Sequence, residues 1–156
     1  MVELTGVAHF AIPVSDPERS ARFYTEIVGC KFLHALPDKS MTFLDAGGVC
    51  VLLIKRPPPI VRELEGSYGV HHAFMLTPDD YRAAVDNLRA DGVEIFLEED
   101  RQGGVIDGPR AYFRDPDGTA LEFIVLRQKT RRLFLLNLLT QYGHLGSILA
   151  IATIKR

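Results

Sequence analysis

The sequence predicts an α+β fold that consists of two βαβββ modules. Three observations support this prediction: a strand and helix pattern near the N-terminus recurs about sixty residues later, each helix is followed by three extended runs, and a proline-rich segment separates the halves. The length of 156 residues fits one domain, and 47% hydrophobic residues suffice for a packed core. We expect one domain at 1–126, with modules at 4–55 and 69–126, a linker at 56–68 and a C-terminal extension at 127–156.

The first module opens with GVAHFAIPVSDPERSARFYTEIVGC, which predicts a strand followed by a helix. Ser15 or Asp16 is a suitable N-cap, Pro17 fits the first helical turn, and Gly29 fits the end of the helix. Three extended runs are predicted after this helix, at 31–36, 40–46 and 49–55.

The second module repeats this order in YGVHHAFMLTPDDYRAAVDNLRADGV. Thr77 is the expected N-cap, Pro78 takes the first helical position, and Gly92 ends the helix.

Between the modules, the prolines of RPPPIVRELEGS cannot continue a strand ladder, so this segment is the predicted linker. The extended runs of the second module are predicted at 94–98, 110–115 and 119–126, with a tight turn at Asp115-Pro116-Asp117-Gly118 before the last one.

Charge and cysteine content exclude some classes of protein. The formal net charge of −2 provides no broad basic field, and the sequence has no repeated basic and aromatic pattern, so we expect no nucleic-acid partner. Cys30 and Cys50 form no metal-binding spacing and no disulfide framework, so both are predicted to be reduced core residues. The N-terminus has neither the basic segment nor the long apolar run of a signal peptide, which predicts a cytoplasmic protein.

Two histidines occupy matching places in the duplication. Aligning the modules sets His9 over His71, and strand alternation places each with an alanine on the face opposite to the bulky residues. Because the bulky faces should pack against the helices, both histidines are predicted to face a concave interior. His72 falls on the opposite face and is predicted to belong to the core. His34 and His144 have no symmetric partner and are interpreted as surface or incidental residues.

Glu122 is the one acid in the apolar run that follows the last turn. Such a carboxylate must be solvated at an edge or buried with a partner, because an unpaired buried charge is very costly. Together, His9, His71 and Glu122 form a ligand set that suits a divalent transition metal and leaves coordination positions open. Taken singly, a strand histidine is more often a hydrogen-bonded structural residue, and a strand glutamate usually lies on a wet edge. The matching positions in a duplicated unit favour the metal site.

These residues resemble the vicinal oxygen chelate superfamily, which includes glyoxalase I, extradiol dioxygenases, fosfomycin resistance thiol transferases, methylmalonyl-CoA epimerases and bleomycin-binding proteins. The resemblance covers residues 4–126 and depends on the H-x-A start of each module, the P-x-x-x-x-x-F-Y stretch from Pro17 to Tyr24, and D-P-D-G-x-x-L-E from Asp115 to Glu122. It implies that the modules form an open, cup-shaped, mixed sheet of eight strands, with the metal inside and the helices outside. It also implies a homodimer, in some members with metal ligands drawn from both chains.

Departures from the family patterns bear on the reaction. The additional acidic ligand of glyoxalase I would fall at Leu52, opposite Glu122, which weighs against that activity. Extradiol dioxygenases place a catalytic histidine where this chain has the segment 102–107, which contains none. The phosphonate-binding lysine and serine of fosfomycin thiol transferases correspond to Gln102 and Ile106, which weighs against that activity too.

The resemblance nevertheless predicts a divalent-metal-dependent enzyme, glyoxalase- or dioxygenase-like, that acts on a small molecule by chelating two adjacent oxygens. The expected cofactor is one Fe, Mn, Ni, Co or Zn ion held by His9, His71 and Glu122. The alternative function is a metal-free small-molecule binding or drug-resistance protein of the bleomycin-binding type. A protein of that type would have the same cup-shaped fold but would need no metal ligands.

Tyr112 is the candidate catalytic side chain. It shares its predicted strand face with Arg110 and Arg114, so it could serve as a hydrogen-bond donor or proton carrier, and it could equally form a cross-strand aromatic pair. Nearby, the segment 99–104 contains two glycines and is interpreted as a surface turn, with a lid over the cup as the alternative.

The family pattern ends before the extension 127–156. This extension holds six of the eighteen basic residues and no acid, and 22 uncharged residues lie between Arg132 and Lys155. Their number meets the length of a membrane span, but polar residues and two glycines interrupt them. We favour an arm that packs on its own domain or on a dimer partner, or a segment foreign to the original gene, over a membrane anchor.

Overall fold

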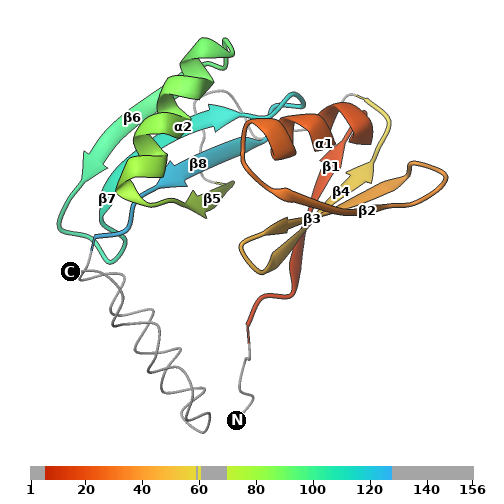
Figure 1. Ribbon diagram of the computed structural model, residues 1–156, viewed down its shortest axis with the longest axis horizontal. Helices are drawn as coiled ribbons and strands as arrows, with labels where there is room; N and C mark the ends of the chain where they lie inside the picture. The colour runs from red at the N-terminus through yellow and green to blue at the C-terminus, as the bar shows by residue number, and fades with distance from the viewer. Residues whose placement is uncertain (1–5, 59, 61–69, 128–156) are drawn as a thin grey trace, which may run out of the picture.

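The computed structural model describes residues 6–58, 60 and 70–127, which form two four-stranded sheets and two helices (Figure 1). The predicted linker lies mostly outside these residues, and so does nearly all of the extension. No helix within the described residues is long and apolar enough to cross a membrane. Each half has the order strand, helix and three strands, which confirms the predicted βαβββ modules. The elements are β1 (His9–Val14), α1 (Pro17–Glu26), β2 (Lys31–Ala35), β3 (Met41–Ala46), β4 (Val49–Lys55), β5 (His71–Met75), α2 (Pro78–Ala90), β6 (Ile95–Arg101), β7 (Gly108–Arg114) and β8 (Ala120–Ile124).

The two sheets have the same topology. The strand order is β1-β4-β3-β2 in the first and β5-β8-β7-β6 in the second. In each sheet the first and last strands of the module pair in parallel, and the other neighbours are antiparallel. Ala11 pairs with Leu52 in the first sheet, as Ala73 pairs with Glu122 in the second. Leu52 therefore occupies the position that corresponds to Glu122, as the alignment of the two modules predicted.

Both helices begin where the sequence predicts them. The side chain of Asp16 accepts hydrogen bonds from two backbone N–H groups of the first turn, so Asp16 rather than Ser15 caps α1. Thr77 caps α2 by accepting a hydrogen bond from the N–H of Asp80. These oxygens satisfy amides that the start of a helix leaves without intrahelical partners. Beyond the end of α2, Gly92 has a φ of 71°, a left-handed conformation that favours glycine.

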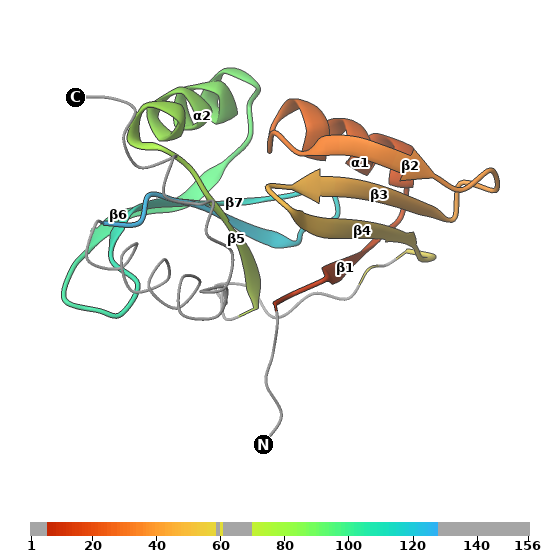
Figure 2. The same cartoon turned by 60° about the horizontal axis from the view of Figure 1, so that its bottom comes forward.

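The core lies between the helices and one face of each sheet. Figure 2 shows both helices on the same side of the two sheets. Burial of each large apolar side chain contributes about 1.5–3 kcal/mol relative to its exposure, so this layer is the main source of hydrophobic stabilisation. The buried side chains here include Ile12, Val14, Tyr24, Leu44, Val51, Leu53, Val85, Leu88, Phe113, Leu121 and Phe123.

His72 joins the two modules. Its ring stacks on Phe10 of β1, with 4.6 Å between the ring centroids and 14° between the ring planes. His72 is half-buried and lies on the opposite face of β5 from His71. The predicted face of His72 is therefore confirmed, whereas its predicted core position is not, because the side chain is only half-buried.

The predicted extent of the loop at 99–104 is wrong. β6 continues through Arg101, which pairs with Gly108, and Glu99 pairs with Arg110. The connection between β6 and β7 is consequently residues 102–107. Pairing continues because each further rung of the ladder satisfies backbone N–H and C=O groups, whatever the polarity of the side chains.

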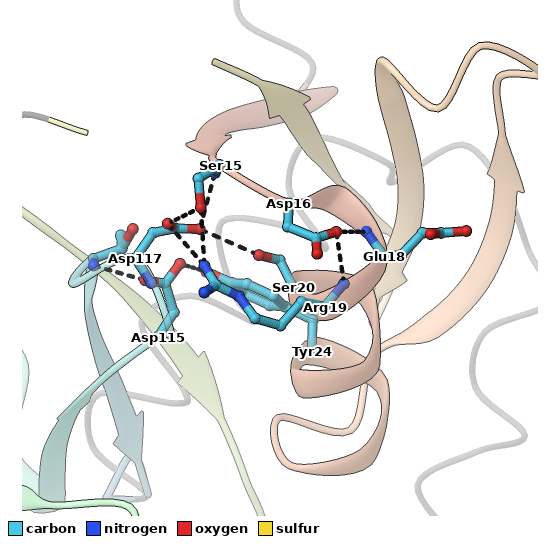
Figure 3. A network of polar contacts seen from close by, with 9 residues as sticks. Ser15, Asp16, Glu18, Arg19, Ser20, Tyr24, Asp115 and Asp117 are labelled. Atoms are coloured by element: carbon cyan, nitrogen blue, oxygen red, sulfur yellow. Dashed lines mark hydrogen bonds and ion pairs between the residues drawn. The ribbon is translucent and has the colours of Figure 1, made fainter. Parts of the chain in front are cut away.

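A polar junction links the turn before β8 to the start of α1 (Figure 3). The Oδ1 atom of Asp115 accepts hydrogen bonds from the backbone N–H of Asp117 at 2.9 Å and of Thr119 at 2.8 Å. Its Oδ2 atom accepts a buried hydrogen bond from the Tyr24 hydroxyl at 3.0 Å. One carboxylate therefore shapes the turn and also ties it to α1.

Asp117 makes the second set of contacts in this junction. It accepts hydrogen bonds from the N–H of Ser15 at 3.0 Å and from the Ser15 hydroxyl at 2.6 Å. Its Oδ1 atom also lies 2.9 Å from a guanidinium nitrogen of Arg19. The Asp-Pro-Asp-Gly turn thus fixes the final hairpin, which contains Glu122, against the first module.

Candidate metal centre

The strands turn the three candidate ligands away from the helices. In β1, Ile12 and Val14 are buried on the helix side, whereas His9 is exposed on the other face. His71 is half-buried on β5, and Glu122 is buried on β8. The predicted faces of both histidines are therefore confirmed.

His71 and Glu122 are in direct contact. Nε2 of His71 lies 2.9 Å from Oε2 of Glu122, whose side chain is 3% exposed. β5 runs parallel to β8, with His71 paired with Ala120 and Ala73 paired with Glu122. Because both of these partners are alanines, the imidazole and the carboxylate meet without a bulky side chain between them.

Arg110 is the third charged group in this cluster. Its Nη1 atom lies 3.3 Å from Oε1 of Glu122, and its side chain is 3% exposed. Its Nη2 and Nε atoms donate hydrogen bonds to the carbonyl oxygens of Ile106 at 2.8 Å and Gly108 at 3.3 Å. The backbone next to β7 thus holds the guanidinium in place, with its third nitrogen beside Glu122.

The two oxygens of Glu122 have different surroundings. Oε2 faces His71, whereas Oε1 forms the ion pair with Arg110. Oε1 is buried and receives no aligned hydrogen bond from the described residues, so the contact with Arg110 is electrostatic rather than a well-formed hydrogen bond. A buried acceptor left in this state is costly, and a cation beside the carboxylate would reduce that cost.

His71 and Glu122 fit a divalent metal ion. Ligand atoms that are each about 2.1 Å from an ion and about 90° apart lie about 3 Å from each other, close to the separation of these two atoms. Imidazole nitrogen and carboxylate oxygen are also donors that divalent Mn, Fe, Co, Ni and Zn accept. In the described part of the chain, no group of three His, Cys, Asp or Glu side chains could hold a metal ion. One chain therefore brings His71 and Glu122 together and leaves His9 outside this pair.

Tyr112 lies beside the pair. It is the cross-strand partner of Glu122, and its ring is edge-on to the imidazole of His71 with 5.4 Å between centroids. Its ring also lies 6.0 Å from that of Phe96. These contacts show the aromatic role that the sequence left open. The role of the Tyr112 hydroxyl as a proton carrier stays a prediction.

The sequence placed Arg110 on the face of Tyr112 but did not reveal its ion pair with Glu122. The sequence did contain a signal for this ion pair. Arg110 lies two residues before Tyr112 on the same strand face, and Tyr112 lies opposite Glu122 in the hairpin, so Arg110 is a diagonal neighbour of Glu122. The pattern does not fix the direction of a long side chain. Here the carbonyl groups of the connection at 102–107 and of Gly108 set that direction.

The two cysteines differ in their surroundings. Cys30 is buried, and this burial, with the charge of Asp45, raises the pKa of its thiol to about 11. The predicted core position is therefore confirmed for Cys30, whose thiol is inert near neutral pH. For Cys50 it is wrong, because this residue is only half-buried and pairs with His9 across β1 and β4.

The repeated modules, with a histidine and a glutamate meeting on β5 and β8, define a two-module α+β protein with a candidate metal site. Residues 6–123 match the family described as the Glyoxalase/Bleomycin resistance protein/Dioxygenase superfamily. The chain belongs to this superfamily, which confirms the resemblance inferred from its motifs.

The names of several relatives refer to thiol transfer or to fosfomycin resistance. Metallothiol transferase FosB from Lysinibacillus sphaericus (strain C3-41) is 29% identical over 117 residues, which cover 75% of this chain and 79% of that protein. Glutathione transferase FosA from Serratia marcescens is 30% identical over 123 residues, which cover 78% and 82%. Among solved structures, the fosfomycin resistance protein FosX from Listeria monocytogenes has a TM-score of 0.67 and 20% identity, covering 85% of this chain and 99% of that chain. This structural likeness supports the fold.

Proposed function

We propose that the protein is a divalent-metal-dependent enzyme of the vicinal oxygen chelate type, acting on a small molecule with two adjacent oxygens. The observation that supports this most directly is the partly buried contact between His71 and the buried Glu122, in which one carboxylate oxygen lacks an aligned donor among the described residues. A cup that only sequesters a ligand has no need to bury such a carboxylate beside an imidazole. The metal-free alternative is therefore disfavoured.

In this proposal the ligand set is completed by a second copy of the chain. His71 and Glu122 of one chain and His9 of the partner subunit would hold the ion. His9 is exposed, and its sheet face also presents half-buried apolar side chains such as Phe43 and Leu52, which favour association with another protein surface. When bound, the metal supplies a Lewis acid that stabilises negative charge developing on a substrate oxygen.

The side chains around the pair favour an anionic substrate. Arg114 lies on the strand face of Tyr112 and Glu122, with its guanidinium 4.9 Å from the centre of the Phe96 ring. It provides positive charge, and Tyr112 provides a hydroxyl that can donate a hydrogen bond or transfer a proton. The transferases among the relatives favour transfer of a thiol to the substrate over dioxygenation. Since Gln102 and Ile106 replace the expected phosphonate-binding residues, we propose a small oxygen-rich anion that differs from fosfomycin as the natural substrate.

Metal analysis tests the proposed function. Wild-type protein purified without chelators is expected to contain about one divalent ion per subunit, whereas Glu122→Ala is expected to bind metal at least about a hundredfold more weakly because it loses a direct ligand. Arg114→Ala is the matched control, since it removes a charge from the same face and no proposed ligand. Activity can then be screened with the metal-loaded protein, a thiol and small oxygen-rich anions, with fosfomycin expected to react poorly. Equally low metal content in wild type and Glu122→Ala would contradict the proposal.

A further inference from the structure

We propose that Arg110 supplies the counter-charge of Glu122 when no metal is bound, and that it therefore stabilises the metal-free protein while weakening its affinity for metal. The inference rests on the proposed function, because it concerns the same carboxylate. It assigns Arg110 a role in setting how readily the site takes up and releases its ion.

The contacts of Arg110 limit what its guanidinium can do. Nε and Nη2 donate hydrogen bonds to the carbonyl oxygens of Gly108 and Ile106, and Nη1 lies 3.3 Å from Glu122. Each nitrogen thus has a partner within the chain, so the guanidinium is not presented to a substrate. Both charged groups are almost fully buried, and their mutual attraction compensates for hydration that each has lost.

The energetic consequence follows from removing one charge. A variant that lacks the guanidinium leaves the Glu122 carboxylate buried with much less compensation in the metal-free protein, which is strongly destabilising. A divalent ion at Glu122 restores that compensation. Metal therefore stabilises the variant more than it stabilises the wild type, and by linkage the variant must bind metal more tightly. Repulsion between Arg110 and the ion acts in the same direction in the wild type.

A pure orienting role for Arg110 predicts the opposite sign. If the guanidinium mainly held Glu122 in the geometry that metal requires, its loss would weaken metal binding about tenfold to a hundredfold. The contact with His71 and the buried backbone of β8 still restrain Glu122 after Arg110 is replaced. We therefore expect the charge effect to dominate.

The experiment compares Arg110→Met with wild type after chelator treatment, by thermal unfolding without metal and by calorimetric titration with Mn(II). The melting temperature of the metal-free variant is expected to fall by about 5–10 °C, and its Kd for Mn(II) is expected to fall about tenfold or more. Arg114→Met removes a charge from the same face and no contact with Glu122, so its Kd for Mn(II) is expected to stay at the wild-type value. Its melting temperature is not part of this control, because Arg114 donates a hydrogen bond to the carbonyl oxygen of Gly118. Arg110→Lys retains a charge but not the fork that binds Gly108 and Ile106, so its Kd is expected to lie between those of wild type and Arg110→Met.

Further variants separate charge from packing. The double variant Arg110→Met with Glu122→Gln removes both charges, so it is expected to regain much of the lost melting temperature while binding no Mn(II). A double variant as unstable as Arg110→Met would overturn the inference. If Arg110→Met does not fold without metal, Arg110→Gln is neutral and retains donors for the loop carbonyls, and the same results are expected of it. If the wild type binds Mn(II) and the neutral variant binds it with the same or a weaker affinity, this inference is overturned while the proposed function stands. A wild type that binds none of the divalent ions of Mn, Fe, Co, Ni and Zn would overturn the proposed function and this inference together.

Discussion

Heterodimers of a His9→Ala chain and a Glu122→Ala chain are expected to recover metal binding that neither variant shows alone. If each site combines the first module of one chain with the second module of the other, one of the two sites in the heterodimer keeps every ligand. Its ligands are His9 from the Glu122→Ala chain, and His71 and Glu122 from the His9→Ala chain. Two affinity tags allow isolation of the heterodimer, and metal analysis should then find about half of the wild-type metal content per dimer.

A second pair of variants provides the control. A heterodimer of His71→Ala and Glu122→Ala chains has both lesions in the second module, so each of its shared sites lacks a ligand. It is expected to bind no more metal than either parent. If the three ligands belonged to one chain, the first heterodimer would recover nothing. Recovery in the control pair would likewise contradict a shared site.

The sequence predicts the faces of the candidate ligands but not their meeting. Alternation along a strand is a local property, so the outward position of His9 and the contrast between His71 and His72 follow from the spacing of their neighbours. Whether His9 approaches Glu122 depends on how the modules and chains associate, which no local period records. The structure brings His71 to Glu122 through the parallel pairing of β5 with β8. Within the described residues His9 lies outside this pair, and its meeting with Glu122 across a dimer stays a prediction.

The Asp-Pro-Asp-Gly turn shows the same limit at a smaller scale. Proline and glycine at these positions predict a reversal of the chain, and the reversal is found. The sequence does not show that the two carboxylates also accept hydrogen bonds from Ser15 and Tyr24, about a hundred residues earlier. Turn propensity acts through backbone dihedral angles, whereas these contacts depend on the docking of α1 against the second module.

Replacement of Asp115 by alanine is expected to lower the free energy of unfolding by about 3 kcal/mol or more. The substitution removes one acceptor from the backbone N–H groups of Asp117 and Thr119 and from the hydroxyl of Tyr24, and the hydrogen bonds of Thr119 and Tyr24 are buried. Chemical denaturation measures the change. Asp45→Ala is the matched control, because Asp45 holds the corresponding turn of the first module and its carboxylate accepts an exposed hydrogen bond from the turn. A loss of about 1 kcal/mol or less is expected there.

The same junction should make stability depend on pH through Asp117. Burial would raise the pKa of this carboxyl, but hydrogen bonds from Ser15 and the charge of Arg19 outweigh it and lower the pKa below the usual value of 3.8. A carboxyl whose pKa is lower in the folded state contributes stability that is complete above its unfolded pKa and is lost as the pH falls below about 4. Wild type should therefore lose stability more steeply on acidification than Asp117→Asn, and parallel profiles would contradict this role. Because β8 begins just after the turn, weakening the junction should also loosen the strand that holds Glu122, although neither aspartate touches the candidate metal site.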